Sequence, residues 1–132
     1  VSQIHTGTAV GKLIGSKKEV RLLADVLRNS LTKPSGNILL EQDWGSLKSA
    51  FPVSSGGLHP GLVPDVLDIY GQDLVLLVSG GIHGHPDGTR AGAEATLQAI
   101  EAWKEGISLP EKAAGSKELA RALEKWGSYQ PK

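Results

Sequence analysis

Three short glycine-rich segments, each lying between an apolar run and a helical pattern, constrain the fold of this chain most strongly. They span residues 4–15 (IHTGTAVGKLIG), 53–59 (VSSGGLH) and 78–86 (VSGGIHGHP). Glycine lets backbone N–H groups approach an anion closely, and a helix that follows points its positive dipole end toward the same place. The pattern therefore predicts three strand ends, each turned into a candidate phosphate site.

The rest of the chain alternates between expected strands and helices. Extended segments are expected at 1–5, 38–44, 51–55 and 73–78, the second of them as a short strand or an extended connection. Helices are expected after Ser16, from 59 to 71 and from 87 to 104, with two shorter ones toward the end of the chain. This order predicts consecutive βα units, an α/β fold with a parallel sheet.

Apolar spacing predicts which faces of these elements are buried. Four sets follow: Val20, Leu23, Ala24 and Leu27; Leu62, Val63, Val66, Leu67 and Tyr70; Ala91, Ala95, Ala99 and Ala102; Leu119, Leu123 and Trp126. Gly71, Gly106 and Gly127 are expected to end helices, and Ser108 with Glu111 forms a capping-box pattern. The continuous apolar run at 73–78 predicts a parallel strand covered on both faces.

Composition excludes several classes of function. The chain has 14 basic and 14 acidic residues with no basic cluster beyond Lys17 and Lys18, which argues against binding nucleic acid or a membrane surface. It lacks cysteine, so disulfides and thiolate metal sites are excluded. The sequence contains neither an apolar run of roughly 18 residues nor a leader pattern, and we expect a cytoplasmic protein.

Lys12 has two interpretations. The segment 6–13 resembles a nucleotide P-loop, but that motif requires glycine where the chain has Thr6 and serine or threonine where it has Leu13. Because Gly11 and Gly15 flank the lysine, it suits a mobile lid that delivers one ammonium group to an anionic substrate. The alternative is an exposed lysine in solvent.

Two Ser-Gly-Gly turns and four histidines are the other candidates. Ser55-Gly56-Gly57 and Ser79-Gly80-Gly81 suit backbone nests for phosphate. The histidines, all at expected strand ends, are His5, His59, His83 and His85. His83 and His85 with His59 could form a metal site, although hydrogen bonding to phosphate or carbonyl oxygen suits them better.

Two further groups are expected to have no role in chemistry. Trp44 and Trp126 lie beside apolar periodic faces and are expected to pack. Glu41 and Asp43 could act as an acid and base pair, but we expect them to be solvated.

Four motifs together resemble the C-terminal part of the large subunit of ribulose-1,5-bisphosphate carboxylase/oxygenase (RuBisCO). They are IHTGTAVGKL, EQDWGS, PVSSGGLHPG and GHPDGTRAGA, in the order and spacing of that family. The segments GIHGHP and ALEKWG are most similar to those of the archaeal, form III branch. The resemblance implies a (β/α)8 barrel, of which residues 1–106 supply strands six to eight and 107–132 a terminal helical extension.

The resemblance also implies an activity and a set of site residues. The family adds CO2 to the enediol of ribulose 1,5-bisphosphate to give 3-phosphoglycerate. His5 would hold the 5-phosphate, and Lys12 would steady the new carboxylate. Ser55 would bind a substrate hydroxyl. The turn residues that would meet the 1-phosphate are Gly57, Ser79 and Gly80, and Gly56 is a further expected substrate-binding residue.

Other parts of the family's site are not in this sequence. The resemblance implies Mg²⁺ held by a carbamylated lysine and two carboxylates that precede residue 1, and a homo-oligomer of at least dimers. The segment alone is therefore expected to be inactive and to need the N-terminal part of the large subunit as its partner.

Three positions depart from the family pattern. They are Ile14, Leu77 and Ser79, of which Ser79 would crowd a phosphate if its φ were positive. Two alternatives stay open at this point: a RuBisCO-like enolase or isomerase acting on a related sugar phosphate, and a non-catalytic βα fragment used in assembly.

Overall fold

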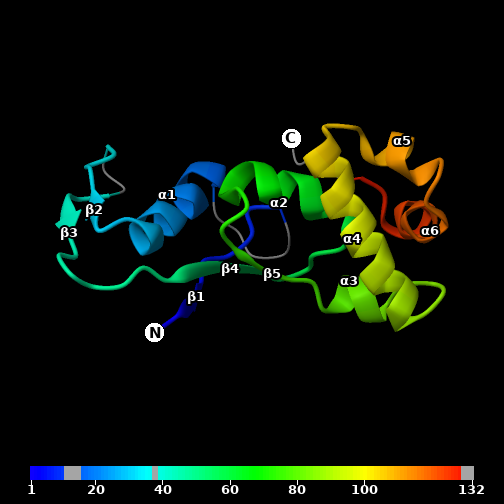
Figure 1. Cartoon of the computed structure of the whole chain (residues 1–132), viewed down its shortest axis with the longest axis horizontal. Coiled ribbons are helices and arrows are strands. Elements are labelled where there is room, and N and C mark those ends of the chain that lie inside the picture. Colours follow the sequence, from blue (N-terminus) through cyan, green and yellow to red (C-terminus); the bar gives the residue numbers. More distant parts are fainter. Residues whose placement is uncertain (11–15, 37–38, 129–132) are drawn as a thin grey trace.

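The computed structural model describes residues 1–10, 16–36 and 39–128, and its centre is a three-stranded parallel sheet (Figure 1). The strands, in the order β1-β4-β5, are β1 (Gln3–His5), β4 (Phe51–Ser55) and β5 (Val75–Leu77). The helices are α1 (Lys17–Arg28), η1 (Pro60–Leu62), α2 (Val63–Tyr70), α3 (Gly80–His83), α4 (Thr89–Glu105), α5 (Leu109–Ala113) and α6 (Lys117–Trp126). The predicted α/β class with parallel strands is confirmed.

Proline in the central strand is tolerated because of its position in the ladder. Phe51 donates its N–H to the Ser2 carbonyl, and Val53 accepts from the Thr6 N–H, so these two residues bond toward β1. Pro52 lies between them and precedes the pairing with β5, which starts at Val53 and Val75. Its missing N–H therefore removes no bond from that ladder.

The segment expected as a strand at 38–44 forms only a two-residue strand, β3 (Gln42–Asp43). It pairs antiparallel with β2 (Leu31–Thr32), which the sequence did not predict. The pair lies apart from the main sheet, at the far end of α1 (Figure 1). Residues 37 and 38 lie outside the described part of the chain.

Helix α1 begins as predicted at Ser16. The Ser16 hydroxyl accepts from the Glu19 N–H, and the Glu19 carboxylate accepts from the Ser16 N–H, a complete capping box that lowers the pKa of Glu19. Val20 and Ala24 are buried, but Leu23 is 49% exposed, so its predicted place on the buried face is wrong. Leu23 lies one residue before Ala24, at the margin of a narrow apolar stripe.

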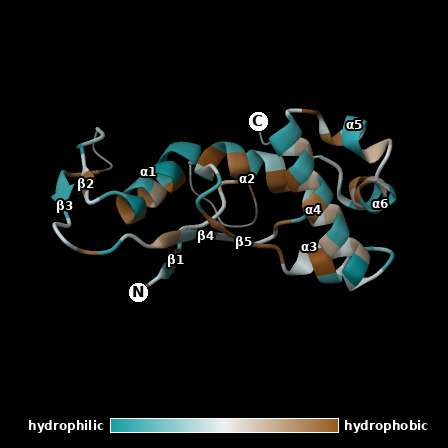
Figure 2. Ribbon diagram, in the orientation of Figure 1, coloured by the Kyte–Doolittle hydropathy of each residue, from teal (hydrophilic) through white to brown (hydrophobic). Residues whose placement is uncertain are grey.

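Helix α2 joins the two parts of the core. All five residues predicted for this face are buried, Leu62 in η1 and the other four in α2, and α2 carries both hydrophobic and hydrophilic residues in Figure 2. Val66 and Tyr70 pack with α1, whereas Val63 and Leu67 pack with Ala99 and the last two helices. Gly71 and Gly106 end α2 and α4 with positive φ, as predicted.

The strand β5 is open on one face at its carboxyl end, where Leu77 lies, although Val53 on the same face is buried, which corrects the prediction that both faces are covered along the whole strand. Ser55 pairs with Leu77 in the register, and Phe51 lies on the same face of the sheet as both. Phe51 is 52% exposed and Leu77 is 46% exposed. An apolar run alone cannot distinguish a strand with two covered faces from one with a bare apolar face.

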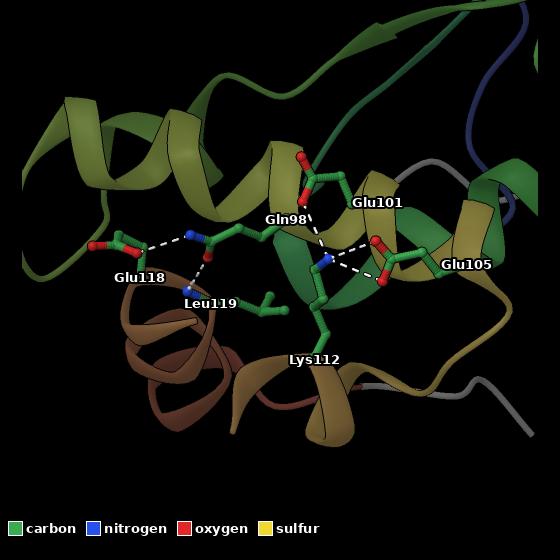
Figure 3. A network of polar contacts seen from close by, with 6 residues as sticks. All are labelled: Gln98, Glu101, Glu105, Lys112, Glu118 and Leu119. Carbon is green, nitrogen blue, oxygen red and sulfur yellow. Dashed lines mark hydrogen bonds and ion pairs between the residues drawn. The ribbon is translucent and has the colours of Figure 1, made fainter. Parts of the chain in front are cut away.

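Polar contacts hold α5 and α6 against α4 (Figure 3). The Lys112 ammonium lies 3.2 Å from Glu101 and 2.9 Å from Glu105, and the Glu105 contact raises the pKa of Lys112. Gln98 accepts from the Leu119 N–H and donates to Glu118, which lowers the pKa of that carboxyl. Ser108 caps α5 through the Glu111 N–H, one half of the predicted capping box.

Within residues 1–10, 16–36 and 39–128, no helix is both long and apolar enough to span a membrane.

Candidate functional site

The carboxyl ends of β1 and β4 bring two predicted site residues together. The Nδ1 atom of His5 lies 2.8 Å from the Ser55 hydroxyl oxygen, although the two residues are 50 positions apart. The parallel register places both side chains, with Leu77, on the same face of the sheet. His5 is exposed and Ser55 is half-buried, so both can meet a ligand.

The chain leaves β1 through a turn held by Tyr70. The Tyr70 hydroxyl, on a side chain only 2% exposed, lies 2.9 Å from the Thr6 hydroxyl and donates to the Gly7 carbonyl at 2.7 Å. Burial raises the pKa of Tyr70. Gly7 has a φ of 90°, which favours glycine. Lys12, the predicted catalytic residue, lies outside the described residues.

The turn after β4 depends on two consecutive glycines. Gly56 and Gly57 have φ values of 108° and 70°. Side chains with a Cβ rarely adopt these values, so the turn that starts at Ser55 is specific to glycine here. Successive backbone N–H groups in such a turn form a concave donor surface suited to an anion.

The turn after β5 is the start of a short helix, which the sequence analysis missed. Ser79 precedes α3 with a φ of −91°, so the concern that its side chain would need a positive φ is removed. A Cβ on Gly80 would meet nothing within 4 Å. The open space beside Gly80 leaves its backbone accessible, and its N–H, in the first turn of α3, has no acceptor within the helix.

The two glycine turns lie against each other. A Cβ on Gly81 would lie 2.5 Å from both the Leu58 carbonyl oxygen and His59 Cα, closer than real Cβ contacts. Gly81 is buried for this reason. The backbone that follows Gly57 therefore touches the backbone that follows Gly80, as the hypothesis of one shared site requires.

The remaining histidines do not form the metal site considered above. His85 is buried: its Nδ1 accepts from the Asp87 N–H, so its Nε2 donates to the Glu118 carbonyl. His83 is exposed and contacts Thr89. Over the described ranges, no group of three His, Cys, Asp or Glu residues could hold a metal ion.

The two tryptophans differ in how they pack, and the acidic pair is exposed. Trp126 stacks on His59, with ring centroids 5.6 Å apart and planes at 17°. Trp44 is 40% exposed and lines a surface hollow with Ile4 and Leu47, so it does not pack in the core as predicted. Glu41 and Asp43 are both exposed, as expected.

The fold and site define an α/β protein whose candidate ligand groups gather at the carboxyl ends of parallel strands. Comparison with protein families then matches residues 1–126 to the catalytic domain of the ribulose bisphosphate carboxylase large chain. The chain belongs to the RuBisCO large-chain family.

Named relatives agree with this assignment. The chain is 51% identical over 127 residues to a ribulose bisphosphate carboxylase from Methanocaldococcus jannaschii, covering 96% of this chain. It is 54% identical to another from Thermococcus onnurineus, covering 99% of this chain. In both cases the match spans only 30% of the relative's length.

Solved structures give the same result. A solved archaeal RuBisCO superimposes with a TM-score of 0.86 at 50% identity, over 99% of this chain and 30% of that one. A dimeric RuBisCO from Hyperthermus butylicus also gives 0.86, at 44% identity, over 98% of this chain and 30% of that one. An octameric RuBisCO from Pyrococcus horikoshii gives 0.78 at 44% identity, over 99% and 28%.

Proposed function

We propose that this chain is the C-terminal catalytic segment of a ribulose-bisphosphate carboxylase large subunit, contributing strands six to eight of a (β/α)8 barrel. In this assignment β1, β4 and β5 are those strands, residues 1–106 are the barrel units and 107–132 the helical extension. The contact between His5 and Ser55 at adjacent strand ends is the observation that carries the proposal. Active sites of such barrels lie at this end of the strands.

The proposed roles follow from the chemistry of each group. His5 binds the 5-phosphate of ribulose 1,5-bisphosphate, and Ser55 hydrogen-bonds a substrate hydroxyl while it contacts His5. The 1-phosphate accepts hydrogen bonds from the turn backbone at Gly57, Ser79 and Gly80, and Gly56 completes the first turn as a substrate-binding residue. These neutral donors bind an anion without adding charge to the chain.

Lys12 is proposed to act in the carboxylation step. As the enediol carbon bonds to CO2, negative charge develops on the new carboxylate oxygens. An ammonium group fixed beside these oxygens stabilises that charge. This role follows from the family resemblance of residues 4–13, since Lys12 is outside the described part of the structure.

The proposal assigns Mg²⁺ to other parts of the catalytic domain. The described residues do not fit a magnesium site, because they bring no cluster of metal-ligating side chains together. The bare apolar side chains of Phe51 and Leu77 are proposed to contact the rest of the barrel.

The assembled enzyme is proposed to be a homo-oligomer of at least two large subunits, since the structures of the relatives are named as dimeric and octameric. The isomerase alternative is not favoured, because the relatives at about 50% identity are named carboxylases.

Reconstitution tests the proposed function. The chain would be combined with a polypeptide that supplies the rest of the catalytic domain, then given Mg²⁺, ribulose 1,5-bisphosphate and radiolabelled bicarbonate. We expect labelled 3-phosphoglycerate, and a loss on the order of 10²-fold or more for Lys12→Ala. Lys33→Ala, at an exposed lysine outside the site, is the matched control. Assembly without labelled product would contradict the proposal, as would full activity of Lys12→Ala.

A further inference from the structure

Trp126, the last residue of α6, contacts the segments that follow both glycine turns. Its ring stacks on His59 after the first turn, and lies 6.4 Å from the ring of His85 after the second. The edge of the indole is also 3.5 Å from the position a Cβ would take on Gly84. The neighbouring Lys125 donates to the Gly84 carbonyl and lies 5.0 Å from the indole centroid.

The stack on Trp126 is the ring contact of the His59 side chain. Its Nδ1 is buried and has no hydrogen-bond partner among the described residues. Burial lowers the pKa of His59, which favours the neutral ring. A stacked aromatic pair of this kind is worth about 0.5–1.5 kcal/mol beyond the area that it buries.

The His59 backbone packs directly against the second turn. His59 Cα and the Leu58 carbonyl occupy the space where Gly81 would carry a Cβ. Two residues after His59, a Cβ on Gly61 would lie even closer to the carbonyl oxygen of Gly127, the residue directly after Trp126. The end of α6, the His59 segment and Gly81 therefore form one continuous set of contacts without space between them.

We propose that Trp126 is a positioning residue that sets the separation of the two glycine turns through its stack on His59. The inference rests on the proposed function in one respect: the amides of the two turns bind the same phosphate group. Trp126 itself touches no substrate. It acts by fixing His59 against Gly81, so that the Gly57 and Gly80 amides are held at a fixed distance.

Inorganic phosphate and the full chain labelled with ¹⁵N provide the test. In the native chain, phosphate is expected to shift the amide resonances of Gly57 and Gly80. Trp126→Leu keeps an apolar side chain but removes the ring, and is expected to weaken phosphate binding about five- to tenfold. Trp126→Phe restores a ring that can stack on His59, and is expected to return the affinity to near the native value.

Leu123 lies on the same helix as Trp126 and packs against the buried cluster that contains Val63, Leu67 and Ala99. Leu123→Ala is the matched control. It is expected to lower the thermal midpoint without changing phosphate affinity. Equal phosphate affinity in Trp126→Leu and the native chain would overturn the proposal, as would the same weakening in Leu123→Ala. If Trp126→Leu does not fold, His59→Leu removes the stack from the other side and is judged by the same criteria.

Failure of the proposed function has a different signature. If no amide of the native chain responds to phosphate, the turns are not a phosphate site. The positioning role is then decided without ligand: the Gly81 amide resonance must move in Trp126→Leu and return in Trp126→Phe. An unmoved Gly81 resonance would overturn it.

Discussion

The His5 imidazole and the Ser55 hydroxyl, 2.8 Å apart, connect the ends of two neighbouring parallel strands. Because His5 is exposed, this hydrogen bond orients a side chain more than it stabilises the fold. The hydrogen bond to Ser55 holds the imidazole in one orientation beside the carboxyl ends of the strands.

Ser55→Ala is expected to free the His5 ring while leaving the fold intact. The free energy of unfolding should fall by only about 0.5–1.5 kcal/mol, because the lost bond is partly solvated. The ¹⁵N spectrum of the imidazole should lose the signature of an engaged Nδ1. Ser49→Ala, at an exposed serine away from the strand ends, is the control and should leave the His5 spectrum unchanged.

Tyr70→Phe removes the hydroxyl that joins Thr6 and Gly7 to α2. The Gly7 carbonyl then lacks its donor, and we expect a loss of about 1–3 kcal/mol in urea unfolding. Thr6→Val removes the other partner of the hydroxyl. A double-mutant cycle of the two should show a coupling of about 0.5 kcal/mol or more, and strict additivity would argue against the network.

Gly80→Ala and Gly81→Ala are neighbouring changes with opposite expected outcomes. A Cβ at Gly81 meets backbone atoms of Leu58 and His59, so this variant should lose about 1–3 kcal/mol or more. A Cβ at Gly80 meets open space, and its variant should stay within about 0.5 kcal/mol of the native chain. Thermal and urea unfolding compare the pair, and equal losses would contradict the packing described.

His59→Phe tests the pH dependence of stability. Burial lowers the pKa of His59 below its ordinary value of 6.5, so as the pH falls below about 6.5 the unfolded chain takes up a proton before the folded chain does. Proton uptake at His59 therefore lowers the free energy of unfolding of the native chain as the pH falls. Phenylalanine keeps a ring beside Trp126 and does not titrate.

The stability of His59→Phe relative to the native chain should accordingly rise between about pH 7.5 and pH 5, measured by urea unfolding at each pH. Titrating groups common to both chains cancel in this difference. Leu123→Ala, which removes no titrating group, is the control, and its stability relative to the native chain should stay constant over the same pH range. A flat difference for His59→Phe would mean that His59 titrates as in the unfolded chain.

The sequence predicted the parts of the fold that depend on local chemistry. The capping residue Ser16, the helix-ending Gly71 and the buried face of α2 each follow from a pattern within a few residues, and all were confirmed. The family resemblance of the glycine-rich segments was confirmed as well. Such features need no knowledge of which segments meet in space.

The errors arose where distant segments decide the outcome. Two-residue strands such as β2 carry almost no periodic signal, and their pairing depends on a partner ten residues away. Leu23 repeats at helical spacing, yet its side chain is 49% exposed, because burial depends on which other element packs beside the helix. The stack of Trp126 on His59 joins residues 67 positions apart, so the pattern around Trp126 could indicate only that it packs.

The sequence named the candidate site residues but did not predict the contacts between them. His5 and Ser55 were named for separate roles, and the hydrogen bond between them depends on the register of β1 and β4. The concern over Ser79 came from its departure from the family pattern, whereas the short helix α3 gives it an ordinary φ. Roles for Lys12 and the turn amides stay predictions until the experiments above are done.

Gly81 and Gly92 each press their main chain directly on a neighbouring segment, Gly81 on Leu58 and His59 and Gly92 on Ile82. A side chain at Gly81 would displace the segment after the β4 turn, which belongs to another βα unit, whereas a side chain at Gly92 would displace Ile82 in α3. Engineering that enlarges Gly81 to alter the second turn will therefore also move the first, so the two turns can be redesigned only together.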